Sequence, residues 1–240
     1  MSSALLVDER PVPDGRYYAS FAAAYVRAVA GHEVPAGASD DDAIVFAQQR
    51  GLDLHTFKRS AVLPRVRRVL GLLRALAPAS LLDVGSGRGA FLWPLLAAFP
   101  ALPVMASDTD TRRVSVMEAV ARGGVERLCA RRTDVTHLDL PDDAVDGVTI
   151  LEVLEHLADP ARAAREVLRV ARRFVIASVP SRPDNNPEHV RCFTRQTLTS
   201  LFLEAGAKRV SVEYVLNHVI ALALIGRARG NGSSDRAPAV

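Results

Sequence analysis

Residues 81–92 read Leu-Leu-Asp-Val-Gly-Ser-Gly-Arg-Gly-Ala-Phe-Leu, an apolar run followed by three alternate glycines. The pattern predicts a buried strand over 80–84, a turn at 85–89 and a helix over 90–99. Glycine lets the backbone approach a ligand closely and also adopts the positive φ angles of a sharp turn. The exposed N–H groups at the start of a helix favour an anionic group. The stretch therefore predicts a nucleotide-like ligand bound at the edge of an α/β sheet.

The glycines alone are compatible with three interpretations. Gly85-x-Gly87-x-x-Ala90 satisfies the dinucleotide fingerprint, and the glycines could also form a turn with a purely structural role. An acid, Asp83, stands two residues before the first glycine, and the motif lies well inside the chain, which disfavours a nicotinamide cofactor. The full pattern, Asp83-x-Gly85-x-Gly87-x-Gly89, resembles the first motif of class I S-adenosylmethionine-dependent methyltransferases.

From residue 80 onward, strand patterns and helix patterns alternate. The further predicted strands cover 103–107, part of 125–134, 146–151, 173–179, 208–214 and 219–225, and the further helices cover 112–121, 160–170 and 194–205. This alternation predicts an α/β fold with a Rossmann-like doubly wound sheet of seven strands. We expect the sheet to be mostly parallel, with an antiparallel strand at the C-terminal end.

The region before the first core strand predicts a helical cap. Its helices are expected at 17–29, 41–50 and 63–76, with Asp40 as the N-cap of the second. We divide the chain into a cap or lid over 1–78, a cofactor-binding core over 79–226 and a disordered tail over 227–240. The cap carries aromatic and polar side chains that either pack in the core or line a pocket: Tyr17, Tyr18, Phe21, Tyr25, His55 and Phe57.

Composition indicates an ordinary globular protein. The 240 residues are 49% hydrophobic and 24% charged, and no apolar run reaches transmembrane length. The start of the chain lacks signal-peptide features, and Cys129 and Cys192 do not suggest a disulfide framework, so we expect a cytoplasmic protein. The net charge is +3, and the basic cluster at 58–74, expected on one helix, is either a solvated face or a contact to an anion.

Acids follow successive predicted strands, at the edge where a doubly wound sheet binds ligands. Asp108 lies 19 residues after Gly89, the spacing of an acid that binds ribose hydroxyls. Asp134 can accept a hydrogen bond from an adenine amine, while Val135 can pack on the ring. Each acid has a plainer alternative, because Asp108 could cap the next helix, as could Asp110, and Asp134 could be a turn residue.

The middle of the chain strengthens the family resemblance. The run Leu-Glu-Val-Leu-Glu-His-Leu-Ala-Asp-Pro at 151–160, with the acids before it, is similar to small-molecule class I methyltransferases, and the likeness covers about 80–226. One departure is that 171–173 read Ala-Arg-Arg where the family often has a Pro-Gly-Gly turn. The resemblance implies S-adenosyl-L-methionine as cofactor. It also implies that the methionine portion is held by Asp83 and Gly85–Gly89 with Ser86, the ribose by Asp108 beside Thr109, and the adenine by Asp134 and Val135, with Leu151 at the same edge.

Methyl transfer requires the nucleophile to be positioned and, where needed, deprotonated. The candidates are Glu152, His156 and His189, although His156 could also have a structural role. We expect the acceptor to be an oxygen or nitrogen atom of a small molecule, in the biosynthesis of a specialised metabolite. No membrane or nucleic-acid partner is expected, and a homodimer is compatible with the sequence.

Two alternatives stay open. Glu152-x-x-Glu155-His156, followed by His189, is similar to metal-dependent RNA 2′-O-methyltransferases, and two carboxylates with two imidazoles could bind a divalent metal. No aromatic-rich surface for single strands is evident, so we assign no metal to the site. The other alternative is a cofactor-binding partner subunit without transferase activity.

Overall fold

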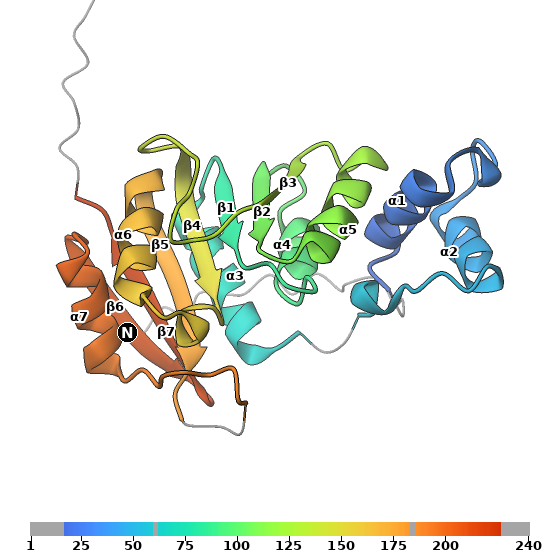
Figure 1. The fold of residues 1–240 in the computed structure, drawn as a ribbon. Coiled ribbons are helices and arrows are strands. Elements are labelled where there is room, and N and C mark those ends of the chain that lie inside the picture. The colour runs from blue at the N-terminus through green and yellow to red at the C-terminus, as the bar shows by residue number, and fades with distance from the viewer. Residues whose placement is uncertain (1–16, 60–61, 183–185, 227–240) are drawn as a thin grey trace, which may run out of the picture.

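The computed structural model describes residues 17–59, 62–182 and 186–226 (Figure 1). The tail predicted to be disordered and the first part of the predicted cap lie outside the described residues. Within the described ranges, no helix is long and apolar enough to cross a bilayer.

A seven-stranded sheet forms the centre of the fold, with the order β3-β2-β1-β4-β5-β7-β6. Its strands β1 to β5 are parallel, and β7 is antiparallel to both of its neighbours, as expected for this fold class. The strand bounds are β1 Leu81–Val84, β2 Val104–Asp108, β3 Leu128–Arg132, β4 Val145–Leu151, β5 Ala171–Pro180, β6 Arg209–Val215 and β7 His218–Leu224. Because β7 is reversed, its first residue lies at the edge where the parallel strands end.

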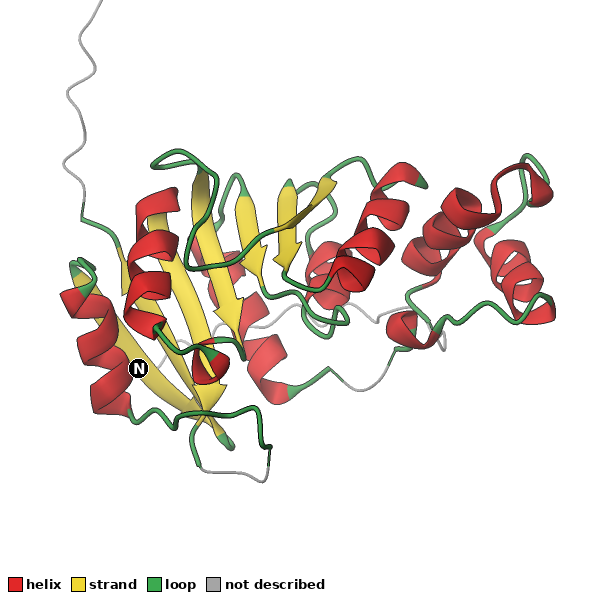
Figure 2. Cartoon of the chain, in the orientation of Figure 1, coloured by secondary structure: helices red, strands yellow, loops and turns green. Residues whose placement is uncertain are grey.

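Helices cover both faces of the sheet (Figure 2). One core cluster joins one face to α3, α4 and α5, and a second joins the other face to α6 and α7. The bounds of these helices are α3 Pro64–Leu76, α4 Leu92–Ala98, α5 Thr111–Arg122, α6 Pro160–Val170 and α7 Arg195–Glu204. Residues 133–144, between β3 and β4, form no helix.

The N-terminal helices pack beside the sheet, next to its β3 edge (Figure 1). Helix α1 (Ala19–Ala30) packs against α5 and against α2 (Asp40–Gln49). At the end of α5, a Cβ on Gly123 would lie 1.8 Å from the Ala24 carbonyl oxygen, so glycine permits this close packing. Residues 52–59 after α2, with the short 3-10 turn His55–Phe57, run along the edge where the parallel strands end (Figure 1).

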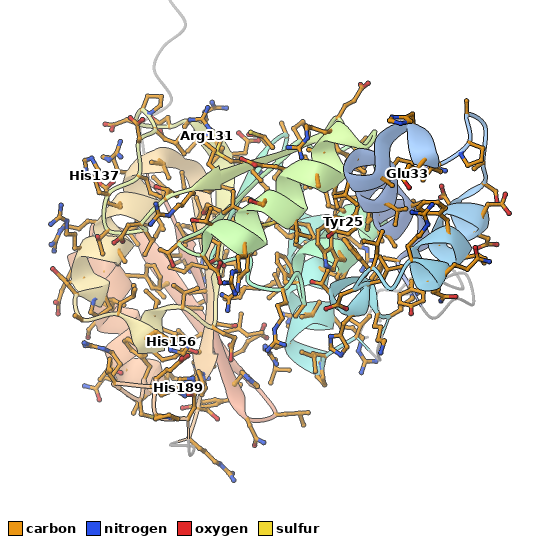
Figure 3. The ribbon with its side chains drawn as sticks, turned by 45° about the vertical axis from the view of Figure 1, so that its right-hand side comes forward. Tyr25, Glu33, Arg131, His137, His156 and His189 are labelled. Atoms are coloured by element: carbon orange, nitrogen blue, oxygen red, sulfur yellow. The ribbon has the colours of Figure 1, made fainter. Side chains whose placement is uncertain are left out.

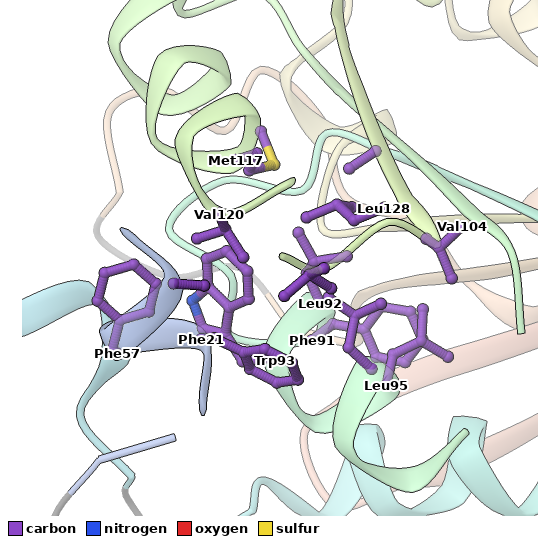
Figure 4. Packing of buried hydrophobic residues seen from close by; sticks show 14 of the residues in the cluster. Phe21, Phe57, Phe91, Leu92, Trp93, Leu95, Val104, Met117, Val120 and Leu128 are labelled. Atoms are coloured by element: carbon purple, nitrogen blue, oxygen red, sulfur yellow. The ribbon is translucent and has the colours of Figure 1, made fainter. Parts of the chain in front are cut away.

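The aromatic side chains of this N-terminal region divide between core and surface. Phe21 and Phe57 are buried, and their rings lie 5.8 and 5.1 Å from that of Trp93 on α4 (Figure 4). Tyr17, Tyr18 and Tyr25 are partly buried against the same cluster. Packing on Trp93 therefore ties the N-terminal region to the glycine turn that precedes α4.

Several predicted boundaries were wrong, for local reasons. The helix expected over 90–99 begins only at Leu92, because the turn continues past Gly89. Ser39, not Asp40, caps α2, since its hydroxyl accepts from the Asp42 N–H and the Asp42 carboxylate accepts from the Ser39 N–H. The basic cluster is not on one helix, because α3 begins at Pro64 and leaves Lys58 and Arg59 outside it.

At the junction between α6 and β5, where the family that the sequence resembles often has a Pro-Gly-Gly turn, the helix connects directly to the strand. Helix α6 ends at Val170 and β5 begins at Ala171. The side chains of Arg172 and Arg173 both bind the buried Asp146 carboxylate, at 2.9 and 3.3 Å. This ion-pair cluster lies at the opposite end of β4 from Glu152 and therefore has a structural role.

Candidate functional site

The glycine turn after β1 has the geometry of a ligand cradle. Gly85, Gly87 and Gly89 have φ angles of 68°, 56° and 83°, which disfavour any side chain. A Cβ on Gly85 would lie 2.3 Å from Val153, and one on Gly89 would lie 2.0 Å from the Trp93 indole. At Gly87, by contrast, the nearest atom beyond its chain neighbours would be the Gly85 carbonyl oxygen at 3.9 Å, an ordinary contact, so a Cβ there would meet no clash. The turn thus leaves room for a ligand against its backbone at Gly87.

Asp83 lies beneath this turn and points into the protein. Its carboxylate accepts hydrogen bonds from the hydroxyls of Ser86, at 2.7 Å, and Thr149, at 2.8 Å. Burial raises the pKa of Asp83 to about 6, and the nearby charge of Asp108 adds to that rise, while the two hydroxyls oppose it. Since the residue is only 2% exposed, Asp83 holds Ser86 and the turn in place from below.

Asp108, at the end of β2, is joined directly to the turn. Its Oδ2 accepts the Gly87 N–H at 2.8 Å, and its Oδ1 accepts the Asp110 N–H at 2.9 Å. The N-cap of α5 is Asp110, whose carboxylate accepts from the Arg112 N–H, so capping does not occupy Asp108. Asp108 is therefore buried beside Gly87, and Thr109 follows it on the surface.

The residues assigned to the adenine differ in exposure. Asp134 is exposed, and its Oδ1 accepts from the N–H and the hydroxyl of Thr136, both at 2.8 Å. Val135 is 5% exposed and belongs to the core cluster of the second face. Leu151 ends β4 and packs in the first cluster. The Asp134 carboxylate thus makes the hydrogen bonds of a turn residue, and its remaining lone pairs can still accept a hydrogen bond from a ligand.

Glu152, directly after β4, is held by side chains from three other elements. Its Oε1 accepts from the Ser178 hydroxyl on β5 at 2.7 Å and lies 3.7 Å from Arg65 on α3, while its Oε2 lies 3.1 Å from Nε2 of His218 on β7. Burial alone would raise the pKa of Glu152, but the hydrogen bonds from His218 and Ser178, with the Arg65 charge, bring it below its usual value.

The backbone of Glu152 is also unusual, with a φ of 57°. A side chain in this left-handed region costs on the order of 1–2 kcal/mol. The fold therefore retains a strained, ionised carboxylate at the end of a central strand. Such strain is typical of functional positions.

The two candidate histidines lie together, apart from Glu152. The rings of His156 and His189 have their centroids 4.7 Å apart and meet edge to face (Figure 3). With buried Glu155 they form a group whose ligand atoms lie within 4.8 Å of one another. Nδ1 of His156 lies 3.0 Å from the Glu188 carbonyl oxygen, which fixes the ring. The structure thus brings together three of the four residues of the predicted Glu-Glu-His-His set and places Glu152 in another network.

A cavity of about 200 Å³ lies between the glycine turn and the N-terminal region. It is lined by Tyr18, His55, Thr56, Lys58, Val62, Leu63, Arg88, Gly89, Ala90, Trp93 and Pro94. Tyr18 and His55 thus line a pocket, whereas Phe21 and Phe57 are core residues. A larger cavity of about 790 Å³ is lined mainly by α6 and contains none of the predicted site residues.

Several residues that shape this edge belong to none of the predicted motifs. Thr149 reaches Asp83 from β4, Ser178 reaches Glu152 from β5, and His218 reaches Glu152 from β7. The only available signal was their position next to predicted strand ends. Their identity as partners depends on sheet order, which local sequence patterns do not encode.

Comparison with known proteins gives consistent results. Residues 82–175 match the family described as methyltransferase domain. The chain is 36% identical over 135 residues to a protein of Mycobacterium tuberculosis named "Probable S-adenosylmethionine-dependent methyltransferase", a match that covers 52% of this chain and 47% of the relative. The chain therefore spans about half the length of the curated relatives that it matches.

Solved structures share the fold. A S-adenosylmethionine-dependent methyltransferase from Aquifex aeolicus aligns with a TM-score of 0.56 and 20% identity, over 68% of this chain and 97% of its own. Magnesium protoporphyrin IX methyltransferase from Synechocystis, solved with S-adenosylhomocysteine bound, aligns with a TM-score of 0.57 and 16% identity, over 76% and 95%. At these identities the alignments support the common fold and say nothing about the acceptor.

Proposed function

Because this chain carries a class I S-adenosylmethionine-dependent methyltransferase domain, we propose that it transfers the methyl group of this cofactor to an oxygen or nitrogen atom of a small molecule. When bound, the cofactor supplies an electrophilic methyl group on a sulfonium. The protein has to hold the cofactor, orient the acceptor, exclude water and accept a proton.

We assign the cofactor to the glycine turn and the acids around it. The observation that carries this assignment is the turn of three positive-φ glycines, in which the Gly87 N–H is fixed by the Asp108 carboxylate. Asp108 and Thr109 would bind the ribose, Asp134, Val135 and Leu151 the adenine, and the turn with Ser86 the methionine portion. Asp83 supports this turn from within the protein and would favour a cationic group above it.

The acceptor would lie between the glycine turn and the residues after β4. Glu152 lies on one side of this region, and the small cavity lined by Tyr18, His55 and Lys58 lies on another. Residues 52–59 would close the site as a lid, since the Thr56 hydroxyl donates to the Arg88 carbonyl at 2.7 Å. Helix α1, which packs on α5 and carries α2 on its other side, would anchor this lid.

Titration calorimetry with S-adenosylhomocysteine, followed by a screen of phenols, alcohols, amines and carboxylates with radiolabelled cofactor, tests this function. We expect micromolar binding and transfer to at least one small-molecule class. Binding without transfer to any acceptor class would favour the non-catalytic partner subunit.

A second candidate function is favoured by the group formed by Glu155, His156 and His189. Two imidazoles and a carboxylate are a donor set for a divalent cation, as in a metal-dependent RNA 2′-O-methyltransferase. Transfer to a 3′-terminal ribose that is abolished by a chelator and restored by Mg²⁺, Mn²⁺ or Co²⁺ would favour this function. Transfer to a small molecule in the presence of chelator would exclude a metal requirement.

The cellular compartment and the partners of the protein are part of the same proposal. Cys129 and Cys192 are free and exposed, which is compatible with a reducing cytoplasm. We infer a small-molecule acceptor as its only obligatory partner and a homodimer as a compatible assembly, which sedimentation analysis would test.

A further inference from the structure

We propose that His218 is the residue that accepts the proton of the acceptor and that Glu152 positions it. This inference rests on the proposed function and deepens it, because it assigns a proton acceptor to the acceptor side of the site. His218 comes from the reversed strand β7, and its role is carried by geometry rather than by any sequence motif.

The first argument is the hydrogen bond between the two residues. Oε2 of Glu152 lies 3.1 Å from Nε2 of His218, and the Glu152 carboxylate is ionised because its pKa lies below its usual range. An ionised carboxylate can only accept, so Nε2 of His218 carries the proton. The neutral imidazole then has its lone pair on Nδ1, which no hydrogen bond uses within the described part of the chain.

The second argument concerns which of the two groups can act as a base. Both oxygens of Glu152 are engaged, one by His218 and the other by the Ser178 hydroxyl with Arg65 at 3.7 Å. These contacts favour the charged carboxylate, which makes Glu152 a weak proton acceptor. An imidazole oriented by a carboxylate is the better base near neutral pH.

The third argument is location. Val153, next to Glu152, packs against Gly85, where a Cβ would be 2.3 Å from its side chain. Glu152, the residue with the strained backbone, is thus connected to the glycine turn through its neighbour Val153. Because β7 is antiparallel to β5, His218 begins its strand opposite Pro180, at the edge where the parallel strands end. His218 therefore lies on the ligand-binding edge of the sheet.

The charges around His218 come from three elements. Glu152 follows β4, Arg65 comes from α3, and the ion pair of Arg68 with Glu213 joins α3 to β6 on the same face of the sheet. The side chain of His218 is 22% exposed and that of Glu152 is 24% exposed, so the pair is shielded but reachable. This arrangement leaves the imidazole as the group that would face the acceptor.

In the transfer, a lone pair on the acceptor oxygen or nitrogen forms the new bond to the methyl carbon. The electron pair of the broken S–C bond stays on sulfur, which becomes a neutral thioether, and the acceptor proton passes to Nδ1 of His218. The imidazolium is stabilised by Glu152 and returns its proton to water. Charge and atoms balance without a further reactant.

The tautomer of His218 can be measured without an acceptor. The full chain, labelled with ¹⁵N-histidine and saturated with S-adenosylhomocysteine, would be studied by long-range ¹H–¹⁵N correlation, with His218→Gln used for assignment. We expect Nε2 to carry the proton and Nδ1 to be bare above neutral pH. A proton on Nδ1 at that pH would overturn the inference.

The kinetic arm uses the acceptor found in the screen. His218→Ala should lower kcat by about 10²-fold or more, with KM and S-adenosylhomocysteine affinity unchanged, and added imidazole should restore part of the rate. His32→Gln, on the surface turn after α1, is the matched control and should behave as wild type. Loss of cofactor affinity and melting temperature together with kcat, without rescue by imidazole, would show a structural role and overturn the inference.

The experiments distinguish a failure of the proposed function from a failure of the role proposed for His218. Absence of S-adenosylhomocysteine binding to the wild-type chain would overturn the proposed function and this inference with it. Normal binding and methyl transfer with the wrong tautomer, or with full activity in His218→Ala, would overturn this inference alone.

Discussion

The main-chain N–H of Gly87 donates to Oδ2 of Asp108 across 2.8 Å, so the carboxylate that ends β2 fixes the turn that follows β1. Two neighbouring parallel strands are thereby linked at the edge where they end. The link defines the shape of the cradle before any ligand binds, and it makes Asp108 important in two ways, as a partner of the turn and as a proposed partner of the ribose.

Asp108→Ala should weaken S-adenosylhomocysteine binding by about 10²-fold, since a charge-assisted hydrogen bond to the ligand and the turn contact are both lost. Titration calorimetry measures this. Asp110→Asn is the control, because it removes the same charge two residues away while asparagine keeps the N-cap of α5. Equal affinity of Asp108→Ala and wild type would contradict the ribose assignment.

Gly89→Ala should be more destabilising than Gly37→Ala. Both glycines have similar φ angles, 83° and 88°, so both variants carry the backbone cost of about 1–2 kcal/mol. Only at Gly89 would the new Cβ meet a buried indole at 2.0 Å, whereas nothing lies within 4 Å at Gly37. We expect an additional loss of about 1–3 kcal/mol in urea unfolding for Gly89→Ala. Equal losses would show that Trp93 can move aside.

Asp83→Asn should stabilise the protein at pH 7.5 and have little effect near pH 4. The pKa of Asp83 is raised to about 6 in the fold, mainly by burial, so the native state binds its proton more tightly than the unfolded chain. The stability that this protonated group contributes is lost as pH rises from about 4 to 6, a cost of roughly 3 kcal/mol. Urea unfolding at several pH values measures the difference.

Asp146 serves as a control, because its pKa is shifted in the opposite direction to that of Asp83. The Ala79 N–H and the charges of Arg173 and Arg172 lower its pKa, so its stabilisation is present above the unfolded pKa and is lost in acid. Asp146→Asn should therefore be destabilising at pH 7.5, with a difference that narrows as pH falls. A similar pH trend in both variants would refute the assignment of these two pKa shifts.

Phe57→Ala should cost about 3–5 kcal/mol, because its side chain is fully buried against Trp93 and Tyr25. We also expect faster proteolytic cleavage of the N-terminal region, since this ring attaches the segment to α4. Val45→Ala, on the exposed face of α2, should change stability by less than about 0.5 kcal/mol. A small effect of Phe57→Ala on both measurements would mean that the N-terminal region is attached elsewhere.

The sequence was informative wherever a local pattern determined the structure. Apolar runs followed by acids located β1 and β2, and Pro160 with Val170 gave the bounds of α6 without error, because proline starts a helix and the apolar spacing is regular. The cap of α2 was misassigned because Ser39 and three successive acids compete for one position, and only the Ser39–Asp42 geometry decides.

Long-range partners could not be predicted in the same way. The network of Glu152, Ser178 and His218 joins residues that are 26 or more positions apart, and it exists because β5 lies between β4 and β7. The grouping of His156 with His189 likewise depends on the fold of the segment after β5. The roles proposed for all these residues stay predictions.

The reversal of β7 has a consequence for how this protein could diversify. The residues to which we assign the cofactor follow β1 to β3 or, in the case of Leu151, end β4, whereas His218 stands directly after the two-residue hairpin tip at Leu216 and Asn217. That tip is peripheral, and Leu216 is 76% exposed. If the proposed acceptor site is correct, changes in the length or composition of this tip would reshape the acceptor side and leave the strand ends assigned to the cofactor intact, so acceptor choice could change at the hairpin alone.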